Sequence, residues 1–244
     1  MPKRKSEGKF EFVKTILIAG ALALGFRSLL FEPFNIPSGS MIPTLLVGDY
    51  LFVSKYSYGY SRYSFPFSMV PIDGRIFKVQ PERGDVAVFR QPKNESVAFI
   101  KRIVGLPGDR IQVTDGVLRI NNEPVSRVQK GFATASNGFS LMQFTVYEET
   151  LPNGKSYFIQ ERADNDMLDN TSIHEVPVGH YFMMGDNRDN SRDSRTTSVG
   201  MVPFENLIGR AERLFFSHNS SANLWQLWKW PFAIRYGRLG DGIL

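Results

Sequence analysis

The pattern of hydrophobic and polar positions separates an apolar N-terminal segment from a long body of short runs. Residues 15–26 (TILIAGALALGF) carry no charge, and the apolar character continues to position 31 apart from Arg27 and Ser28. Counted from residue 13, the segment approaches the ~20 residues that a helix needs to cross a bilayer, and an Arg so near its end is able to reach the headgroups. Pro33 must end any such helix. We therefore predict one N-terminal helix that spans a membrane.

The body of the chain alternates short runs of β-branched and aromatic residues with turn signals such as Asp115-Gly116 and Asn153-Gly154. This pattern predicts short strands joined by turns. The runs predicted as strands are 49–55, 85–89, 97–103, 110–113, 117–120, 144–147, 157–160, 180–184 and 207–216. We find no long amphipathic helix and no repeat, so the predicted class is mostly β, in a sandwich or barrel-like arrangement. The more polar strands between 111 and 179 are expected to form an inserted lobe.

Composition removes several chemistries. The 244 residues are 42% hydrophobic and 22% charged, which is typical of a globular protein rather than a disordered one. The chain has no Cys, so it forms no disulfide, no thiolate metal site and no Cys nucleophile. It also lacks a G-x-S-x-G elbow and an H-E-x-x-H motif, and its three His residues have no ligand spacing. We therefore expect no metal and no cofactor.

Most of the net charge of +5 lies at the N-terminus: residues 1–14 hold five basic and two acidic side chains, which leaves +2 for the other 230 residues. A nucleic-acid-binding domain would need basic residues clustered on a folded face, so nucleic acid is not an expected partner. By the positive-inside rule, 1–14 is a basic cytoplasmic tail, 15–31 is a transmembrane anchor, and the rest lies across the membrane. A cleaved signal peptide and a buried helix remain alternatives, although the small residues expected at a cleavage site lie inside the apolar segment.

Three dense segments remain, at 35–45 (NIPSGSMIPTL), 99–109 (FIKRIVGLPGD) and 185–195 (GDNRDNSRDSR). Each has an ordinary interpretation: a turn, a strand whose Lys101 points outward, and a solvated charged loop. The last segment lacks the central Gly and final Glu of a calcium-binding loop. Lys101 is the least ordinary feature, because an ammonium group inside an apolar run is costly unless it is paired or neutral.

Taken together, the strings P-S-G-S-M-x-P-T-L, K-R-x-x-G-x-P-G-D and G-D-N-R-x-N-S-x-D-S-R resemble the signature boxes of bacterial type I signal peptidases, also called leader peptidases. The apolar segment before the first box matches as well, and the resemblance covers roughly 31–113 and 180–216. It implies a signal-peptidase-like fold of short antiparallel β-strands behind one N-terminal transmembrane helix. The implied catalytic domain comprises 32–110 and 180–244, and the implied inserted β lobe is 111–179.

The resemblance implies a serine–lysine dyad, with Ser40 as nucleophile and Lys101 as general base. A hydroxyl needs an adjacent base, and Lys serves only when neutral; lowering its pKa from ~10.4 to ~8 is a bias of roughly 3 kcal/mol. Burial beside apolar neighbours supplies that bias, and Arg could not substitute because it does not deprotonate. The other implied roles are oxyanion donation by the Ser38 hydroxyl and the Ser40 amide, orientation of the base by Ser191, and support of the site by Asp193, Arg195, Arg102 and Asp186.

Signal peptidases accept small residues, typically Ala, directly before the cut and two positions earlier. The implied reaction is therefore removal of signal peptides from exported preproteins after Ala-x-Ala. The implied pocket residues are Phe34, Ile36, Met41, Leu45, Phe99 and Ile100. Ala98 departs from the acidic or polar residue expected at its position, which leaves fine specificity open. The implied partners are signal peptides and membrane lipid, and the implied location is a bacterial cytoplasmic membrane, crossed once, with the catalytic domain on the periplasmic or outer face.

Two aromatic stretches, 56–67 and 225–232, have two interpretations. They are either ordinary β packing or an exposed surface resting on the bilayer, where Trp and Tyr favour the interface.

Two other functions also stay open. One is a different Ser-Lys hydrolase, such as a repressor-type self-cleaving protease. The other is a membrane-anchored β binding module without chemistry, which predicts no special role for Ser40 and Lys101.

Overall fold

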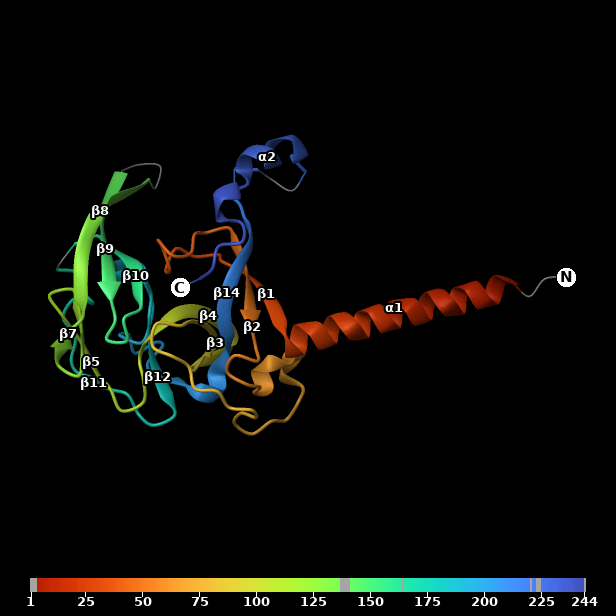
Figure 1. Cartoon of the computed structure of the whole chain (residues 1–244), viewed down its shortest axis with the longest axis horizontal. Coiled ribbons are helices and arrows are strands. Elements are labelled where there is room, and N and C mark those ends of the chain that lie inside the picture. The colour runs from red at the N-terminus through yellow and green to blue at the C-terminus, as the bar shows by residue number, and fades with distance from the viewer. Residues whose placement is uncertain (1–3, 137–140, 164, 220, 223–224, 244) are drawn as a thin grey trace.

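The computed structural model describes residues 4–136, 141–163, 165–219, 221–222 and 225–243. Residues 1–3, the start of the predicted basic tail, lie outside the described residues. A single long helix, α1 (Arg4–Leu29), points away from a body built of strands (Figure 1). Its stretch Phe10–Leu29 has a mean hydropathy of 1.6 and only 6% of it is buried, so it is long and apolar enough to span a membrane.

The predicted anchor, 15–31, differs from α1 at both ends. The helix starts within the basic segment, at Arg4, and ends at Leu29. Strand β1 (Phe31–Asn35) follows almost at once and contains Pro33, whose ring cannot continue a helix. The first strand therefore follows the helix after a single residue, Leu30.

The body contains one large antiparallel sheet, which we call the large sheet. Its strands, in spatial order, are β1, β2 (Asp49–Ser54), β14 (Leu207–Ser217), β3 (Val86–Gln91), β4 (Asn94–Gly105), β12 (His180–Met184) and β13 (Val202–Pro203). The sheet curves enough that Phe34 of β1 and Ile100 of β4 pack against the same buried cluster. This curvature brings the first and second sequence boxes together although two other strands lie between β2 and β4.

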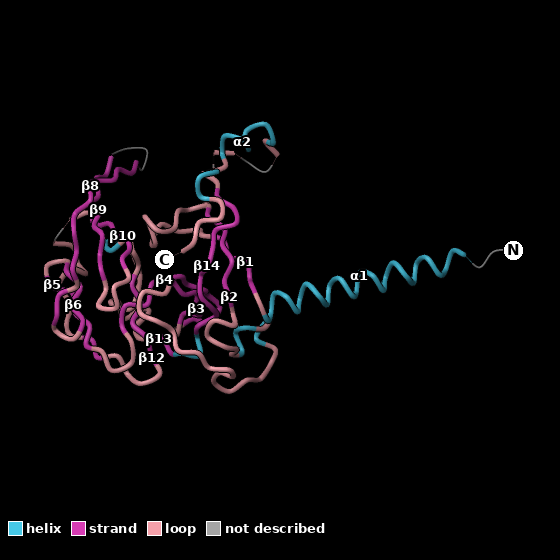
Figure 2. The backbone as a smooth tube through the Cα atoms, viewed as in Figure 1, coloured by secondary structure: helices cyan, strands magenta, loops and turns pink. Residues whose placement is uncertain are grey.

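Residues 110–175 form two smaller antiparallel sheets on the far side of the body from α1 (Figures 1 and 2). The first contains β11 (His174–Glu175), β5 (Arg110–Thr114), β6 (Val117–Ile120) and β7 (Glu123–Pro124). The second contains β10 (Ser156–Glu161), β9 (Leu141–Thr150) and β8 (Ser126–Ser136). We refer to these two sheets together as the lobe.

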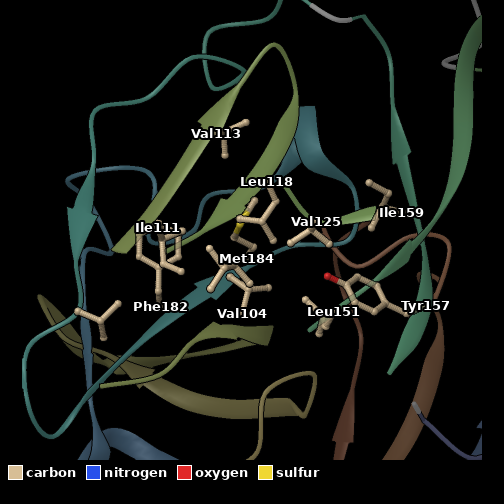
Figure 3. Close-up of a cluster of buried hydrophobic side chains, with 12 residues drawn as sticks. Val104, Ile111, Val113, Leu118, Val125, Leu151, Tyr157, Ile159, Phe182 and Met184 are labelled. Atoms are coloured by element: carbon tan, nitrogen blue, oxygen red, sulfur yellow. The ribbon is translucent and has the colours of Figure 1, made fainter. Parts of the chain in front are cut away.

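The described residues of the lobe share a core with the large sheet. One cluster of buried side chains joins Val104 of β4 and Met184 of β12 to Leu118 of β6 and Ile159 of β10 (Figure 3). Burying such side chains stabilises the protein by roughly 1.5–3 kcal/mol each, so this shared cluster ties the lobe firmly to the large sheet. A residue of the lobe is therefore able to influence the large sheet through direct packing.

The mostly β class is confirmed, and each predicted strand overlaps an observed one. Of the two interpretations of 56–67, ordinary packing holds for Tyr58 and Tyr63, which are buried in the body. By contrast, Trp225, Trp228 and Phe232 are exposed, beside or within the short helix α2 (Trp230–Ala233).

Candidate active site

Ser40 lies in the turn between β1 and β2, in the first of the three boxes. Asn187, from the third box, holds this turn from two directions. Its backbone N–H donates to the Ser40 carbonyl over 3.1 Å, and its side-chain amide donates to the Gly39 carbonyl over 2.9 Å. The turn is therefore fixed by a segment almost 150 residues away in the sequence, which is how a loop reaches the rigidity a reactive group needs.

Lys101 lies in β4, at the point where the strand passes from an exposed half to a buried half. Its side chain is only 4% exposed, and its ammonium nitrogen donates a hydrogen bond to Ser40 Oγ. Burial lowers the pKa of Lys101 from its ordinary value to about 8, although the carboxylates of Asp193 and Asp186 act in the opposite direction. A substantial share of Lys101 is thus neutral at mildly alkaline pH.

Asp193 and Arg195 form a buried ion pair in the third box. The Arg195 guanidinium donates to both carboxylate oxygens, over 3.0 and 2.9 Å, and the Gly185 N–H adds a third bond at 3.0 Å. Burial alone would raise the pKa of Asp193, but these donors lower it below its usual value. Asp193 therefore stays charged, and Arg195 opposes its effect on the pKa of Lys101.

Arg102 and Asp186 form a second buried pair, which joins β4 to the third box. Arg102 donates through Nε and a terminal nitrogen to the two Asp186 oxygens, over 2.9 and 2.8 Å. Thr44, in the Ser40 turn, donates to the same carboxylate over 2.5 Å. Asp186 thus connects all three sequence boxes, and the bidentate geometry fixes their relative positions.

Ser191 lies beside this group, with a buried hydroxyl. Among the described residues its Oγ makes no well-directed hydrogen bond, to Lys101 or to another group, although it helps to stabilise the Asp193 carboxylate. Gly185 explains the tight fit here. A Cβ at position 185 would lie 2.2 Å from Ser191 Oγ and 2.5 Å from the Ser40 carbonyl oxygen, so only glycine fits between them.

Ser40 and Lys101 open into a cleft of about 610 Å³. Four of the six predicted pocket residues line it: Phe34, Ile36, Phe99 and Ile100. The exposed Ser38, the buried Ser191 and Ala98 line it as well. Met41 and Leu45 do not, because both are fully buried in the core beneath the Ser40 turn, where they support the cleft from behind.

Several neighbours of the cleft carried no signal in the sequence. Leu168, from the lobe, lines the cleft although nothing in its local sequence distinguishes it. Asp189 and Arg192 also line it, and their place inside the third box was the only available hint. Across the described part of the chain, no cluster of three or more His, Asp or Glu side chains has the geometry to hold a metal ion.

Comparison with known proteins shows the family to which the chain belongs. Residues 9–216 match the family described as "Signal peptidase, peptidase S26". The chain is 48% identical over 204 residues to signal peptidase I of Rickettsia typhi, which covers 80% of this chain and 76% of that protein. It is 47% identical over 218 residues to signal peptidase I of Rickettsia conorii, covering 86% and 78% respectively.

A solved signal peptidase I from Enterococcus faecalis is 25% identical and covers 54% of this chain and 97% of its own, with a TM-score of 0.32 that is too low to compare the folds. The family match and the relatives define a serine peptidase. The chain belongs to the signal peptidase I family, whose members remove signal peptides from preproteins.

Proposed function

We propose that this protein is a membrane-anchored endopeptidase that cuts signal peptides with Ser40 as nucleophile and Lys101 as general base. The observation that carries the proposal is the hydrogen bond between Lys101 Nζ and Ser40 Oγ, made by a lysine whose buried position lowers its pKa to about 8. A neutral amine facing a hydroxyl is the arrangement that activates a serine without histidine.

The proposed reaction proceeds by acyl transfer. Neutral Lys101 takes the hydroxyl proton as Ser40 Oγ attacks the carbonyl carbon, and the resulting ammonium gives that proton to the leaving amine. Lys101, neutral again, then removes a proton from water, which attacks the acyl-enzyme and releases the product as the proton returns to Ser40. The oxyanion needs donors in place before the reaction. The Ser38 hydroxyl and the Ser40 amide are the proposed donors, supported by their place in the cleft.

The proposed specificity is for small residues before the cut, as in Ala-x-Ala. Bulky apolar side chains, Phe34, Ile36 and Ile100, line the cleft next to Ser40 and leave little depth for a large substrate side chain. A pocket that selects by excluding bulk discriminates by roughly 1–3 kcal/mol per methylene. Ala98 lines the same cleft, and its small side chain occupies little of it, so tolerance slightly beyond Ala is part of the proposal.

The proposed location is a bacterial cytoplasmic membrane, with α1 as the anchor. Its apolar stretch is hardly buried by the protein, so in water it would expose a large apolar surface. The net +3 of residues 1–14 favours a cytoplasmic N-terminus and a catalytic domain on the far side. The exposed Trp225, Trp228 and Phe232 are side chains suited to contact with lipid at the interface.

Cleavage of a preprotein bearing an Ala-x-Ala site, by the purified full-length chain in lipid vesicles, tests the proposal. We expect one cut after the second Ala in the wild type, and none with Ser40→Ala or Lys101→Ala. Lys93→Ala, at an exposed position in the turn after β3, is the matched control and should cut normally. Normal cleavage by either dyad variant contradicts the proposal, and cleavage of the enzyme alone would point to a self-cleaving hydrolase instead.

A further inference from the structure

The lobe places a buried carboxylate against the active-site loop. Glu149 of β9 is fully buried, and Arg188, in the third box, donates to both of its oxygens, one over 3.1 Å and the other through a shorter bond. Both side chains are at most 2% exposed. A buried ion pair is strongly unfavourable to break, because it leaves a charge without a partner. The lobe therefore constrains the position of Arg188 and of the loop that carries it.

Tyr157 of β10 links this pair to a second active-site arginine. Its hydroxyl donates to Glu149 over 2.5 Å, and the Arg102 guanidinium lies over its ring, 3.9 Å from the ring centroid. A guanidinium stacked on an aromatic face is attracted to it and held in plane. Tyr157 thus contacts the lobe's carboxylate on one side and the neighbour of Lys101 on the other.

Through Arg102 and Arg188, both contacts connect to groups beside Ser40 and Lys101. Arg102 pairs with Asp186, which accepts from Thr44 in the Ser40 turn. The Arg188 carbonyl accepts a hydrogen bond from Arg195 over 2.6 Å, and Arg195 pairs with Asp193. Asp186, Asp193 and Arg195 are among the charged groups that act on Lys101.

Strand β10 also runs along the loop itself. The Gln160 N–H donates to the Asp186 carbonyl over 2.9 Å, and the Arg162 N–H donates to the Asp189 carboxylate over 2.6 Å. The lobe and the active-site loop are therefore joined by backbone contacts as well as by the buried ion pair. Loosening one of the side-chain contacts would still leave the lobe attached.

We propose that Glu149 and Tyr157 are positioning residues for peptide cleavage. They hold Arg188 and Arg102 so that Lys101 stays shielded from water and within hydrogen-bond distance of Ser40. The proposal rests on the proposed dyad, but it concerns residues that neither touch the substrate nor line the cleft. It gives the lobe a defined role, as the scaffold of the catalytic loop.

The proposal makes a specific statement about the basicity of Lys101. Asp186 and Asp193 raise its pKa, Arg192 and Arg195 lower it, and burial is the largest influence. If the lobe contact is loosened, water reaches Lys101 and Asp186 is less well neutralised by its arginine. Both changes favour the ammonium form, so the lower-pH limb of the rate profile should move to higher pH.

The test compares three variants of the full-length chain in vesicles. Tyr157→Leu removes the ring under Arg102, Tyr157→Phe removes only the hydroxyl, and Glu149→Gln removes the charge opposite Arg188. Val113→Ala is the control, because Val113 belongs to the shared core but lies away from Tyr157 within it (Figure 3). For each, kcat, KM and the pH dependence of kcat/KM are measured on an Ala-x-Ala preprotein, with thermal unfolding measured in parallel.

We expect Tyr157→Leu to lower kcat by about 10- to 100-fold with KM nearly unchanged, and to move the limb up by about half a pH unit or more. Tyr157→Phe should recover most of the loss. Val113→Ala should unfold at lower temperature with kcat and limb unchanged. If Tyr157→Leu and Glu149→Gln behave like Val113→Ala, the proposal is overturned. If Glu149→Gln does not fold, the comparison of Tyr157→Leu with Tyr157→Phe still tests the proposal.

A failure of the positioning role can be distinguished from a failure of the proposed dyad. If Lys101→Ala cleaves normally, the dyad is wrong whatever the lobe variants do. If Lys101→Ala is inactive while the lobe variants keep wild-type kcat and limb, only the positioning role is wrong.

Discussion

Two of the lysines whose burial the structure describes are buried, in two different regions, and they have different partners. Lys55, at the junction of α1 with the large sheet, is 2% exposed and lies 2.9 Å from the Glu32 carboxylate. Lys101, in the cleft, is 4% exposed and donates to a hydroxyl, and no carboxylate lies within ion-pair distance of it among the described contacts. Burial lowers the pKa of both, but only at Lys55 does a directly paired carboxylate oppose it.

The difference shows how the same side chain serves two purposes. A buried ammonium beside a carboxylate remains an ion pair and fastens two segments together. A buried amine beside a hydroxyl, whose nearest carboxylates are each paired with an arginine (Arg102 and Arg195), is free to exchange a proton. Burial alone does not identify a base; the partner does.

The largest expected effect separates the two lysines by one matched substitution. Lys101→Met should lower kcat/KM by about 1,000-fold or more, because the base is lost, while thermal stability stays the same or rises since a costly buried amine is gone. Lys55→Met should keep kcat/KM within about 3-fold, as Glu32 retains its 2.5 Å pair with Arg27. Preprotein cleavage and thermal unfolding measure both. Equal activity losses would show that burial, not the hydroxyl partner, sets the role.

A smaller effect is expected when the hydroxyl partner is moved and both lysines are left intact. Gly185→Ala would place a Cβ 2.5 Å from the Ser40 carbonyl oxygen, so the Ser40 turn must shift. We expect kcat to fall about 100-fold, as for other displacements of about 1 Å in a reacting pair. Gly237→Ala is the control, because nothing lies within 4 Å of the added carbon. Wild-type kcat in Gly185→Ala would mean that the Ser40–Lys101 geometry is not critical.

The smallest effect on cleavage is expected at the other lysine, where the change is in the stability of the fold. Glu32→Gln removes the paired carboxylate of Lys55, and we expect unfolding to become easier by about 2–4 kcal/mol at pH 7. The pKa of Lys55, already lowered, should fall further. Between that pKa and 10.5 the unfolded chain binds more protons, so the variant should regain stability as pH rises.

Unfolding midpoints at pH 7 and 9.5 measure this change. Glu95→Gln, in an exposed ion pair with Arg62, is the control and should change little at either pH. If Glu32→Gln is as stable as the control, Lys55 does not depend on its carboxylate and the contrast between the two lysines is lost.

Most of the fold could be predicted from the sequence because alternation and turn residues mark its strands. Five of the described strands were missed, for physical reasons. β7, β11 and β13 have only two residues each, too few to form a pattern. β8 (Ser126–Ser136) has few apolar residues and a Gly, so its pattern is weak. β1 contains Pro33, which argues against a strand unless the strand lies at a sheet edge, as β1 does.

The candidate site was predictable only where it lies in dense local motifs. Ser40, Lys101 and the Arg102–Asp186 and Asp193–Arg195 pairs come from such motifs, and the structure brings them together. The partner of Arg188 is Glu149, which lies 39 positions away in a strand with no motif, so no local pattern could reveal it. Met41 and Leu45 were predicted in the pocket but lie in the core, because a turn has no periodicity from which to infer a side chain's direction.

The pH dependence of kcat/KM on an Ala-x-Ala preprotein tests the central claim most directly, namely that neutral Lys101 is the base. Below the pKa of Lys101 the active fraction grows about tenfold per pH unit. The rate should therefore rise from pH 6 and level off above about pH 8, where the pKa lies. Lys55→Met should show the same limb. A rate that is flat or falls between pH 6 and 8 would contradict the account.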